Sequence, residues 1–219
     1  VERGYARRVL AQDPVDTPAT GEKELTRLQV ALADPSASED EGPLKAFALA
    51  RRNFLSGERI DMSALARDLD INRVTLYRWV GSREQLMVEL IWSFTDRTID
   101  WLDADITATG ADRMIELGTR YLEAINDNHG MNVWLGYEGE YAMRLATSNE
   151  TDFQSRLIAK VEVPFGEEAA AGRLDLPVVV HEVAFVFVRL IESYVYRDLI
   201  TGERSDPKSL KPILNMLLR

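Results

Sequence analysis

Apolar side chains recur at helical spacing along most of the chain. In the segment PLKAFALARRNFLSG, which begins at residue 43, Leu44, Phe47 and Phe54 fall on roughly one side of a helix. Glycines and prolines separate the further helices that the pattern predicts, near residues 83–104, 111–127, 132–146, 150–171, 177–200 and 207–217. The Val- and Phe-rich run at 178–188 is the best strand candidate, but it continues too far without a break, and no clean strand alternation occurs elsewhere. The pattern therefore predicts an all-α protein.

Two short helices are predicted between residues 61 and 81. Asp61 and Asn72 are each suited to cap the N-terminus of a helix, and Gly81 is suited to end the second one. Ser82 and Gln85 have the spacing of a capping box for a third, longer helix. A helix as short as the second cannot be stable alone in water. It must be held by neighbours through Leu76 and Val80, which lie four residues apart on one side.

Residues 1–42 are predicted to be an N-terminal extension, because they combine several prolines with the acidic run SASEDEG. Within them, GEKELTRLQVALAD places Leu25, Leu28 and Leu32 at helical spacing, which predicts a short amphipathic helix. Two domains are expected to follow. The first covers residues 43–90 and contains the two short helices, and the second is a helical domain over residues 91–219.

Composition argues against several kinds of site. The sequence has no cysteine and only two histidines, His129 and His181, so neither a thiolate nor a His-rich metal site is expected, and no cofactor motif occurs. The most apolar segment, PVVVHEVAFVFVRLIESYVY, carries His181, Glu182, Arg189 and Glu192, which favours a buried helix over a membrane span. No apolar run typical of a secretion signal opens the sequence. We therefore expect a cytoplasmic protein without a membrane partner.

Charge is unevenly distributed along the sequence. The net charge of −10 opposes binding of nucleic acid by the whole surface. Residues 43–90, however, contain eight Lys or Arg against six Asp or Glu, so the remainder of the chain carries the negative charge. The relatively basic part includes Arg73, Thr75, Tyr77 and Arg78 on the second short helix, on sides not used by Leu76 and Val80. Arg and Thr suit base edges in a major groove, and Tyr suits phosphate oxygens. A helix, a tight turn and a short second helix form the helix-turn-helix pattern of DNA binding, although an ordinary three-helix unit with exposed arginines is the alternative.

The segment MSALARDLDINRVTLYRWVGSREQL resembles the DNA-binding segment of TetR-type transcriptional regulators. The resemblance covers residues 44–90, and its matching features are listed here: Phe54, Gly57, Leu65-Ala66, Thr75-Leu76-Tyr77, Trp79 and Ser82-Arg83. Val80 departs from the Phe that is frequent in the family, and Asp61 from the usual Thr or Ser. The pattern is also similar to the QsdR-type branch of the family, which implies a lactone effector and genes for lactone breakdown.

The resemblance implies a role in DNA binding for eight residues. It implies base-edge contacts from Arg73, Val74 and Thr75, and backbone contacts from Tyr77, Trp79 and Arg83. Arg78 could make either kind of contact, and Ser63 could reach a phosphate. Tyr77 could instead pack on the preceding helix, and Trp79 could lie mostly in the core.

Residues after 91 are expected to form an effector pocket and a dimer interface. Trp134, Tyr137 and Tyr141 fall on one side of a helix and could line a mostly apolar pocket, although plain core packing is the alternative. Trp92, His181 and Phe185 are the other candidates for this pocket. The predicted 177–200 helix is apolar nearly all round, so it must be covered twice. Candidate dimer contacts on it are Val183, Val186, Leu190 and Tyr194.

The sequence therefore predicts a non-enzymatic, homodimeric transcriptional regulator. It is expected to act as a repressor that binds a double-stranded DNA operator and leaves it when a small apolar or amphipathic effector binds. Two alternatives remain open. One is a helical enzyme that uses His181 and Glu182 as acid and base. The other is a helical DNA-binding or partner-binding protein without an effector.

Overall fold

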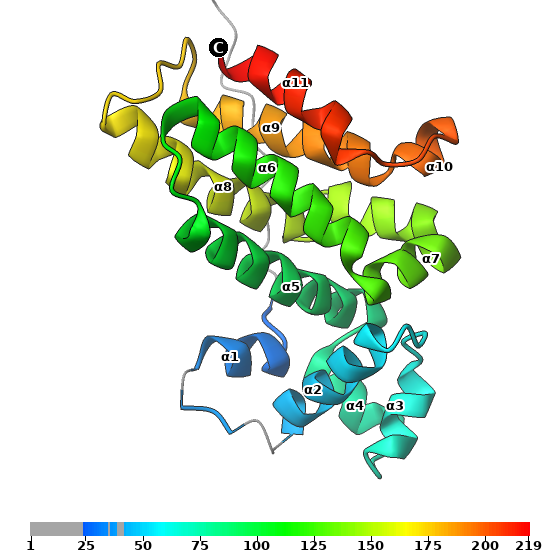
Figure 1. Cartoon of the computed structure of the whole chain (residues 1–219). Helices are drawn as coiled ribbons and strands as arrows, with labels where there is room; N and C mark the ends of the chain where they lie inside the picture. The colour runs from blue at the N-terminus through cyan, green and yellow to red at the C-terminus, as the bar shows by residue number, and fades with distance from the viewer. Residues whose placement is uncertain (1–23, 35, 39–41) are drawn as a thin grey trace, which may run out of the picture.

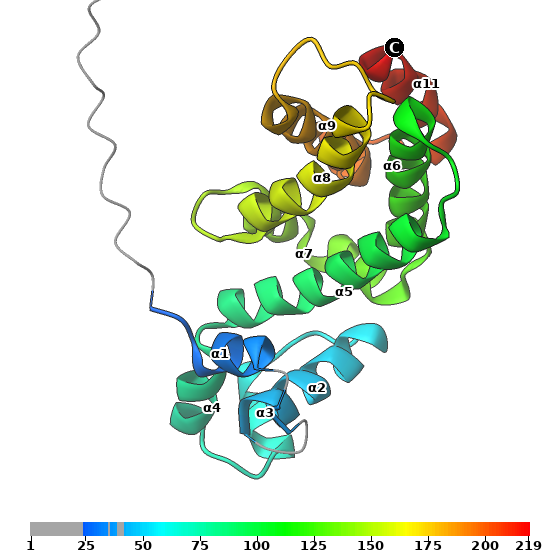
Figure 2. The ribbon, with the colours of Figure 1, turned by 90° about the vertical axis from the view of Figure 1, so that its left-hand side faces the viewer.

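The computed structural model of the chain describes residues 24–34, 36–38 and 42–219. Every regular element within these residues is an α-helix, which confirms the all-α prediction. Four helices form an N-terminal group: α1 (Arg27–Ala33), α2 (Gly42–Leu55), α3 (Met62–Asp68) and α4 (Arg73–Val80). The long helix α5 (Arg83–Asp105) leads from this group to α6 (Gly110–Asp127), α7 (His129–Thr147), α8 (Phe153–Ala170), α9 (Val180–Val195), α10 (Arg197–Thr201) and α11 (Pro207–Leu218) (Figure 1). Figure 2 shows α5 between the N-terminal group and the C-terminal helices.

The predicted caps begin and end the short helices of the N-terminal group. The Asp61 side chain accepts hydrogen bonds from the backbone N–H groups of Ser63 and Ala64, and the Asn72 side chain accepts one from Thr75. Ser82 and Gln85 form the capping box at the start of α5. The left-handed φ of +74° at Gly81 ends α4. Each of these features is local, and the sequence predicted each one.

Helix α1 belongs to the N-terminal group and packs against α2 and α4. Leu28 is completely buried there, whereas Leu25 and Leu32, which share the predicted apolar stripe, remain exposed. Thr26 lies so close to Gly81 that a Cβ on this glycine would be 2.8 Å from the Thr26 methyl group. The predicted helix in the extension is therefore present, and we propose that the N-terminal domain includes residues 24–34 together with the 43–90 region.

Two predicted helices of the C-terminal part are interrupted in the structure. The 177–200 segment is divided into α9 and α10, because Tyr196 leaves helical geometry at φ −100° and ψ 16°. Helix α7 contains a kink at Glu138, with φ −134° and ψ 34°. None of the helices in the described residues combines the length and the apolarity that crossing a membrane requires.

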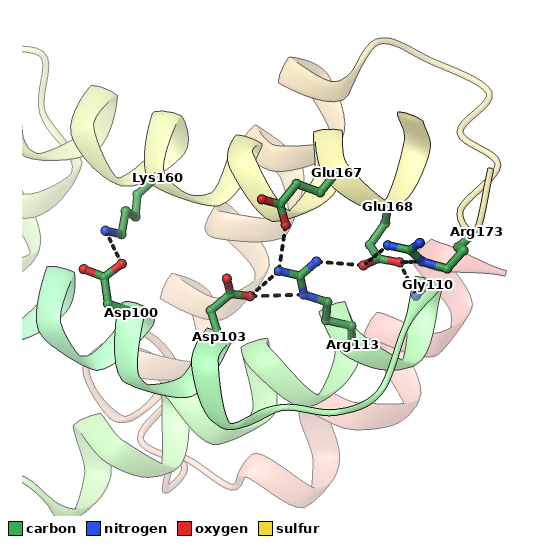
Figure 3. Close-up of polar contacts among 8 residues, drawn as sticks. All are labelled: Asp100, Asp103, Gly110, Arg113, Lys160, Glu167, Glu168 and Arg173. Atoms are coloured by element: carbon green, nitrogen blue, oxygen red, sulfur yellow. Dashed lines mark hydrogen bonds and ion pairs between the residues drawn. The ribbon is translucent and has the colours of Figure 1, made fainter. Parts of the chain in front are cut away.

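A buried carboxylate, Glu168, joins the distal ends of α6 and α8 (Figure 3). It accepts hydrogen bonds from the Gly110 backbone N–H at 2.6 Å, from Arg113 at 2.7 Å and from Arg173 at 2.6 Å. Hydrogen bonds from Arg173, Gly110 and Arg113, in that order, outweigh the effect of burial and lower the pKa of Glu168 to about 2. Arg113 also pairs with Asp103 at the end of α5. This network therefore fixes three helices of the C-terminal part to one another.

Candidate DNA interface and ligand cavity

One side of α4 is buried in the core of the N-terminal group. Leu76 and Val80 have no solvent-exposed surface, and both belong to the hydrophobic core. Because α4 has only eight residues, this packing rather than its own hydrogen bonds must keep it helical. The packing also fixes which side chains face outward.

The opposite side of α4 presents the residues predicted to bind DNA. Arg73, Val74, Tyr77 and Arg78 are exposed, with Val74 at 77% of its full exposure. The Arg73 guanidinium lies 5.9 Å from the centre of the Tyr77 ring. Arg73 and Val74 are the first two residues of the helix. The exposed side of α4 is therefore positively charged, and an α-helix has a size that a major groove admits.

The other predicted DNA contacts lie at the margins of this surface. Ser63 is exposed at the start of α3, and Thr75 is half-buried. Trp79 is half-buried against the core, which agrees with the alternative that it mainly packs. Asp61 is exposed, and its hydrogen bond from the Ala64 backbone N–H keeps its pKa below the ordinary value. It therefore places a carboxylate beside the positive surface.

The contacts of Arg83 lie within the chain, whereas the sequence predicted a contact with a DNA phosphate. Its Nε donates to the carbonyl oxygen of Ile60 at 2.8 Å, and one terminal nitrogen lies 2.6 Å from the carboxylate of Glu138 in α7. Its guanidinium also lies 5.1 Å from the centre of the Tyr141 ring. In this structure Arg83 thus joins the N-terminal group to the C-terminal helices. This contact could not be predicted from the sequence, because the partners of Arg83 lie far away along the chain.

A largely apolar cavity lies within the C-terminal helices. Helices α5, α6, α7, α8 and α9 all contribute to its wall, with side chains such as Phe94, Leu117, Trp134 and Phe187. The space accessible to the centre of a water molecule is about 70 Å³. This is several times the roughly 10–15 Å³ that one water needs. The cavity is therefore real but small in this state.

A few polar groups lie among the apolar residues of the cavity wall. The hydroxyl groups of Thr95 and Tyr121 are hydrogen-bonded at 3.1 Å, and burial raises the pKa of Tyr121 to about 12. Burial also raises the pKa of Tyr196 above its ordinary value. Glu192 pairs with Arg189 at 2.7 Å, yet its burial raises the pKa of the carboxyl to about 7. Hydroxyl groups and one carboxyl with a raised pKa therefore supply much of the polarity of the cavity.

Only one of the six predicted effector contacts lines this cavity, namely Trp134. Tyr137 is 75% exposed, and Tyr141 lies between Arg83 and Arg144. Trp92 stacks against Arg156 at 4.4 Å in a separate groove. These three side chains therefore do not line this cavity, because helical spacing alone does not show which neighbour a face meets.

The last two predicted effector contacts, on α9, also point away from the cavity. His181 is exposed and forms a hydrogen bond with Glu162 of α8, and Phe185 is 42% exposed. The residues that do supply polar groups here, Thr95, Tyr121 and Glu192, were not predicted. The presence of Glu192 in the apolar run of residues 177–196 was the one available signal.

The four predicted dimer contacts divide into two pairs. Val186 is exposed and Leu190 is half-exposed on the outer side of α9. Val183 is buried within the chain, and the Tyr194 hydroxyl donates to the Ser209 carbonyl in the segment that begins α11. Val183 and Tyr194 thus make contacts within their own chain, and the four residues stay a prediction for the interface.

The helix-turn-helix group and the cavity-containing helical body define the class of protein as a one-component transcriptional regulator. The family model described as "Tetracyclin repressor-like, C-terminal domain" matches residues 109–219. The chain therefore belongs to the TetR family of transcriptional regulators.

One solved structure agrees with the fold along most of the chain. It is that of the transcriptional repressor QsdR from the TetR family of R. erythropolis, with a TM-score of 0.74 and 22% identity. The alignment covers 83% of this chain and 96% of the QsdR chain. No match was found among curated proteins.

Proposed function

We propose that the protein is a homodimeric repressor that binds a two-fold symmetric DNA operator through α4 and leaves it when an effector enters the C-terminal cavity. The observation that carries the DNA-binding part is the division of α4 into two sides. Leu76 and Val80 fix the helix from behind, while Arg73 and Arg78 project from the front. Arg can donate two parallel hydrogen bonds to guanine, and Val74 offers an apolar contact for a thymine methyl group.

An exposed apolar surface on α8 and α9 supports dimerisation. Val163 on α8 and Phe185 and Val186 on α9 are 58%, 42% and 39% exposed. Exposed apolar groups on neighbouring helices are typical of an interface, and a two-fold symmetric contact would place two copies of α4 for two half-sites. We therefore propose this surface, with Leu190, as the dimer interface.

The chemistry of the cavity favours an uncharged, mainly apolar effector with at least one hydrogen-bond acceptor. The wall is mostly aliphatic and aromatic, and its tyrosine and threonine hydroxyl groups can donate to a carbonyl oxygen. An ester or lactone has such a carbonyl and no charge, so the lactone implied by the sequence is compatible with this wall. An anionic effector would lose its hydration without finding a cation, because no Lys or Arg among the described residues lines the wall, and the one carboxyl there, Glu192, already pairs with Arg189.

The small volume of the cavity supports a population shift as the mechanism. Pockets that bind drug-sized ligands measure roughly 300–1,000 Å³, far more than the volume of about 70 Å³ in this structure. Binding would therefore favour a second state in which the cavity helices lie further apart. A ligand shifts an equilibrium only by the difference between its affinities for the two states. For effector binding to release DNA, the state that the effector favours must therefore hold the DNA-binding helices in a different arrangement.

The alternatives receive less support from the geometry. TetR-type regulators are generally not enzymes, and His181 is exposed beside Glu162 rather than directed into the cavity. A protein that binds DNA without sequence preference remains the competing function, since exposed arginines also suit phosphates.

Selection of duplexes from a random-sequence pool by the full chain tests the proposal. We expect enrichment of a two-fold symmetric motif whose half-sites are one helical turn of DNA, about 34–36 Å, or a multiple of it apart. Binding that depends on salt but enriches no motif would favour the non-specific alternative.

A further inference from the structure

Helix α7 lies between the ligand cavity and the DNA-binding group. A Cβ on Gly130 would be 2.3 Å from the carbonyl oxygen of Phe54, so α7 and the end of α2 are in direct backbone contact. Further along α7, the ring of Trp134 lies 5.9 Å from that of Phe54. Trp134 also lines the cavity. One side chain of α7 therefore contacts both the cavity and the DNA-binding group.

One turn after Trp134, the carboxylate of Glu138 holds two arginines of the DNA-binding group. Arg59, from the loop between α2 and α3, contacts it at 2.8 Å, and Arg83, the first residue of α5, contacts it at 2.6 Å. The Trp134 indole N–H donates to the same carboxylate at 3.2 Å. The Glu138 side chain is only 11% exposed. Three groups from three segments thus converge on one shielded carboxylate.

The charge state of Glu138 agrees with this geometry. Burial opposes ionisation, but hydrogen bonds and charge from Arg83, together with hydrogen bonds from Arg59 and Trp134, hold the pKa of Glu138 below its ordinary value. The contacts with both arginines are therefore ion pairs at neutral pH. Because the carboxylate is shielded, solvent and salt screen the Arg83 pair less than a surface pair. Arg59, at 73% exposure, contributes less.

The backbone at Glu138 is also a point at which α7 departs from a regular helix. Glu138 itself has the non-helical ψ of 34°, and the adjacent Gly139 approaches α10 so closely that a Cβ would be 2.7 Å from the Leu199 side chain. Leu199 follows Tyr196, whose side chain lines the cavity, by three residues. The kink therefore lies between two elements that reach the cavity. One is Trp134, which lines it, and the other is α10, which follows directly after the cavity residue Tyr196.

We propose that Glu138 is the positioning residue that sets the orientation of the DNA-binding group according to the state of the cavity. In the structure described here, it fixes Arg59 and Arg83 while the cavity is small. Displacement of Trp134 or of α10 by a ligand moves the carboxylate and with it both arginines, since all three donors share it. The effector side of this inference rests on the proposed function. The mechanical link between cavity, Glu138 and DNA-binding group does not require DNA.

The absence of cysteine from the sequence allows a direct measurement of this link. Spin labels are placed on exposed sites of α4 and α6 through Arg78→Cys and Glu123→Cys. The doubly labelled full chain is diluted with unlabelled chain, so that only distances within one chain are measured by double electron–electron resonance. Glu138→Gln removes the charge, and Glu140→Gln, at an exposed site on the same helix, is the matched control. Ala124→Phe fills the cavity and replaces the unidentified effector.

We expect Glu138→Gln to shift or broaden the distance distribution and Glu140→Gln to leave it unchanged. Ala124→Phe should shift the distribution in the otherwise native chain, and the shift should fall by at least about threefold when Glu138→Gln is also present, because coupled sites are not additive. Arg59→Met, at an exposed position, tests the same contact if Glu138→Gln lowers the folded fraction, and it should broaden the distribution to a smaller extent.

A distribution that neither Glu138→Gln nor Arg59→Met changes would overturn the proposal, as would an Ala124→Phe shift of undiminished size in the double variant. Neither DNA nor effector is present in the measurement. Failure here would therefore leave the proposed DNA binding untouched, and failure to find an operator would leave this inference untouched.

Discussion

Replacement of Leu76 by alanine is expected to lower the free energy of unfolding of the N-terminal group by about 2–5 kcal/mol, because it leaves a cavity behind a completely buried side chain. Helix α4 is only eight residues long and cannot compensate by its own stability. We therefore expect the variant to lose operator binding although Leu76 contacts no DNA. Urea denaturation followed by circular dichroism, together with a DNA-binding titration, measures the two effects.

Val74→Ala is the matched control for the stability effect of Leu76→Ala, since both positions are on α4 and Val74 is 77% exposed. A surface substitution of this kind changes stability by at most about 0.5 kcal/mol. Equal stability of the two variants would show that Leu76 does not hold α4 in place, and would contradict the proposed two-sided arrangement of this helix.

Replacement of Glu168 by glutamine is expected to lower the free energy of unfolding at neutral pH by about 2–4 kcal/mol, because it removes the shielded negative charge that Arg113 and Arg173 share, and an amide cannot accept all of the hydrogen bonds that the carboxylate accepts. The effect should depend on pH in a defined direction. The folded-state pKa of Glu168 is lowered to about 2 from an ordinary value of 4.5. Its stabilisation is therefore complete above about pH 4.5 and is lost as the pH falls towards 2. The stabilities of the native chain and of Glu168→Gln should therefore converge as the pH falls, and denaturation of both at pH 7, 4 and 3 measures this.

Glu167 provides the control for Glu168, because it is adjacent in the sequence and contacts Arg113 from an exposed position. Glu167→Gln should change stability by less than about 1 kcal/mol at any of these pH values. A difference between the native chain and Glu168→Gln that stays constant from pH 7 to pH 3 would show that the carboxylate is not held ionised by its partners.

The sequence was sufficient to predict the features that depend on neighbours along the chain. Capping by Asp61 and Asn72, the stop at Gly81 and the buried pair Leu76 and Val80 all follow from residue preferences within one or two turns. The exposure of Arg73 then follows, because a helix fixed on one side must present the other. For this reason the bounds of α3 and α4 could be predicted nearly to the residue, whereas the packing of α1 against α2 and α4 could not.

Contacts between distant segments could not be predicted from the same preferences. Trp92 and Tyr141 are amphipathic aromatic residues that suit a ligand pocket, but the fold places each beside an arginine instead. Tyr121 lines the cavity because α6 packs beside α5 and presents it to Thr95. Helical periodicity identifies an apolar face, but it does not show whether that face meets a cavity, the core or another chain.

The break at Tyr196 and the kink at Glu138 were missed for a related reason. Neither site contains proline, and the glycines beside Glu138 are tolerated in helices at modest cost. Their conformations are set by tertiary contacts, such as the approach of Leu199 to Gly139 and the convergence of Arg59 and Arg83 on one carboxylate. Departures from regular helix geometry are therefore concentrated where the DNA-binding group and the cavity meet α7.

The central claim, that the exposed side of α4 recognises base sequence, is tested most directly by the affinities of the native chain and of Arg73→Ala for a selected operator and for a scrambled duplex at one salt concentration. We predict that the native chain binds the operator at least about 10³-fold more tightly. Arg73→Ala should reduce this ratio by the equivalent of about 1–3 kcal/mol, whereas Arg204→Ala, an exposed arginine between α10 and α11, should leave it unchanged. Equal affinity of the native chain for both duplexes, or an unaltered ratio in Arg73→Ala, would contradict the claim.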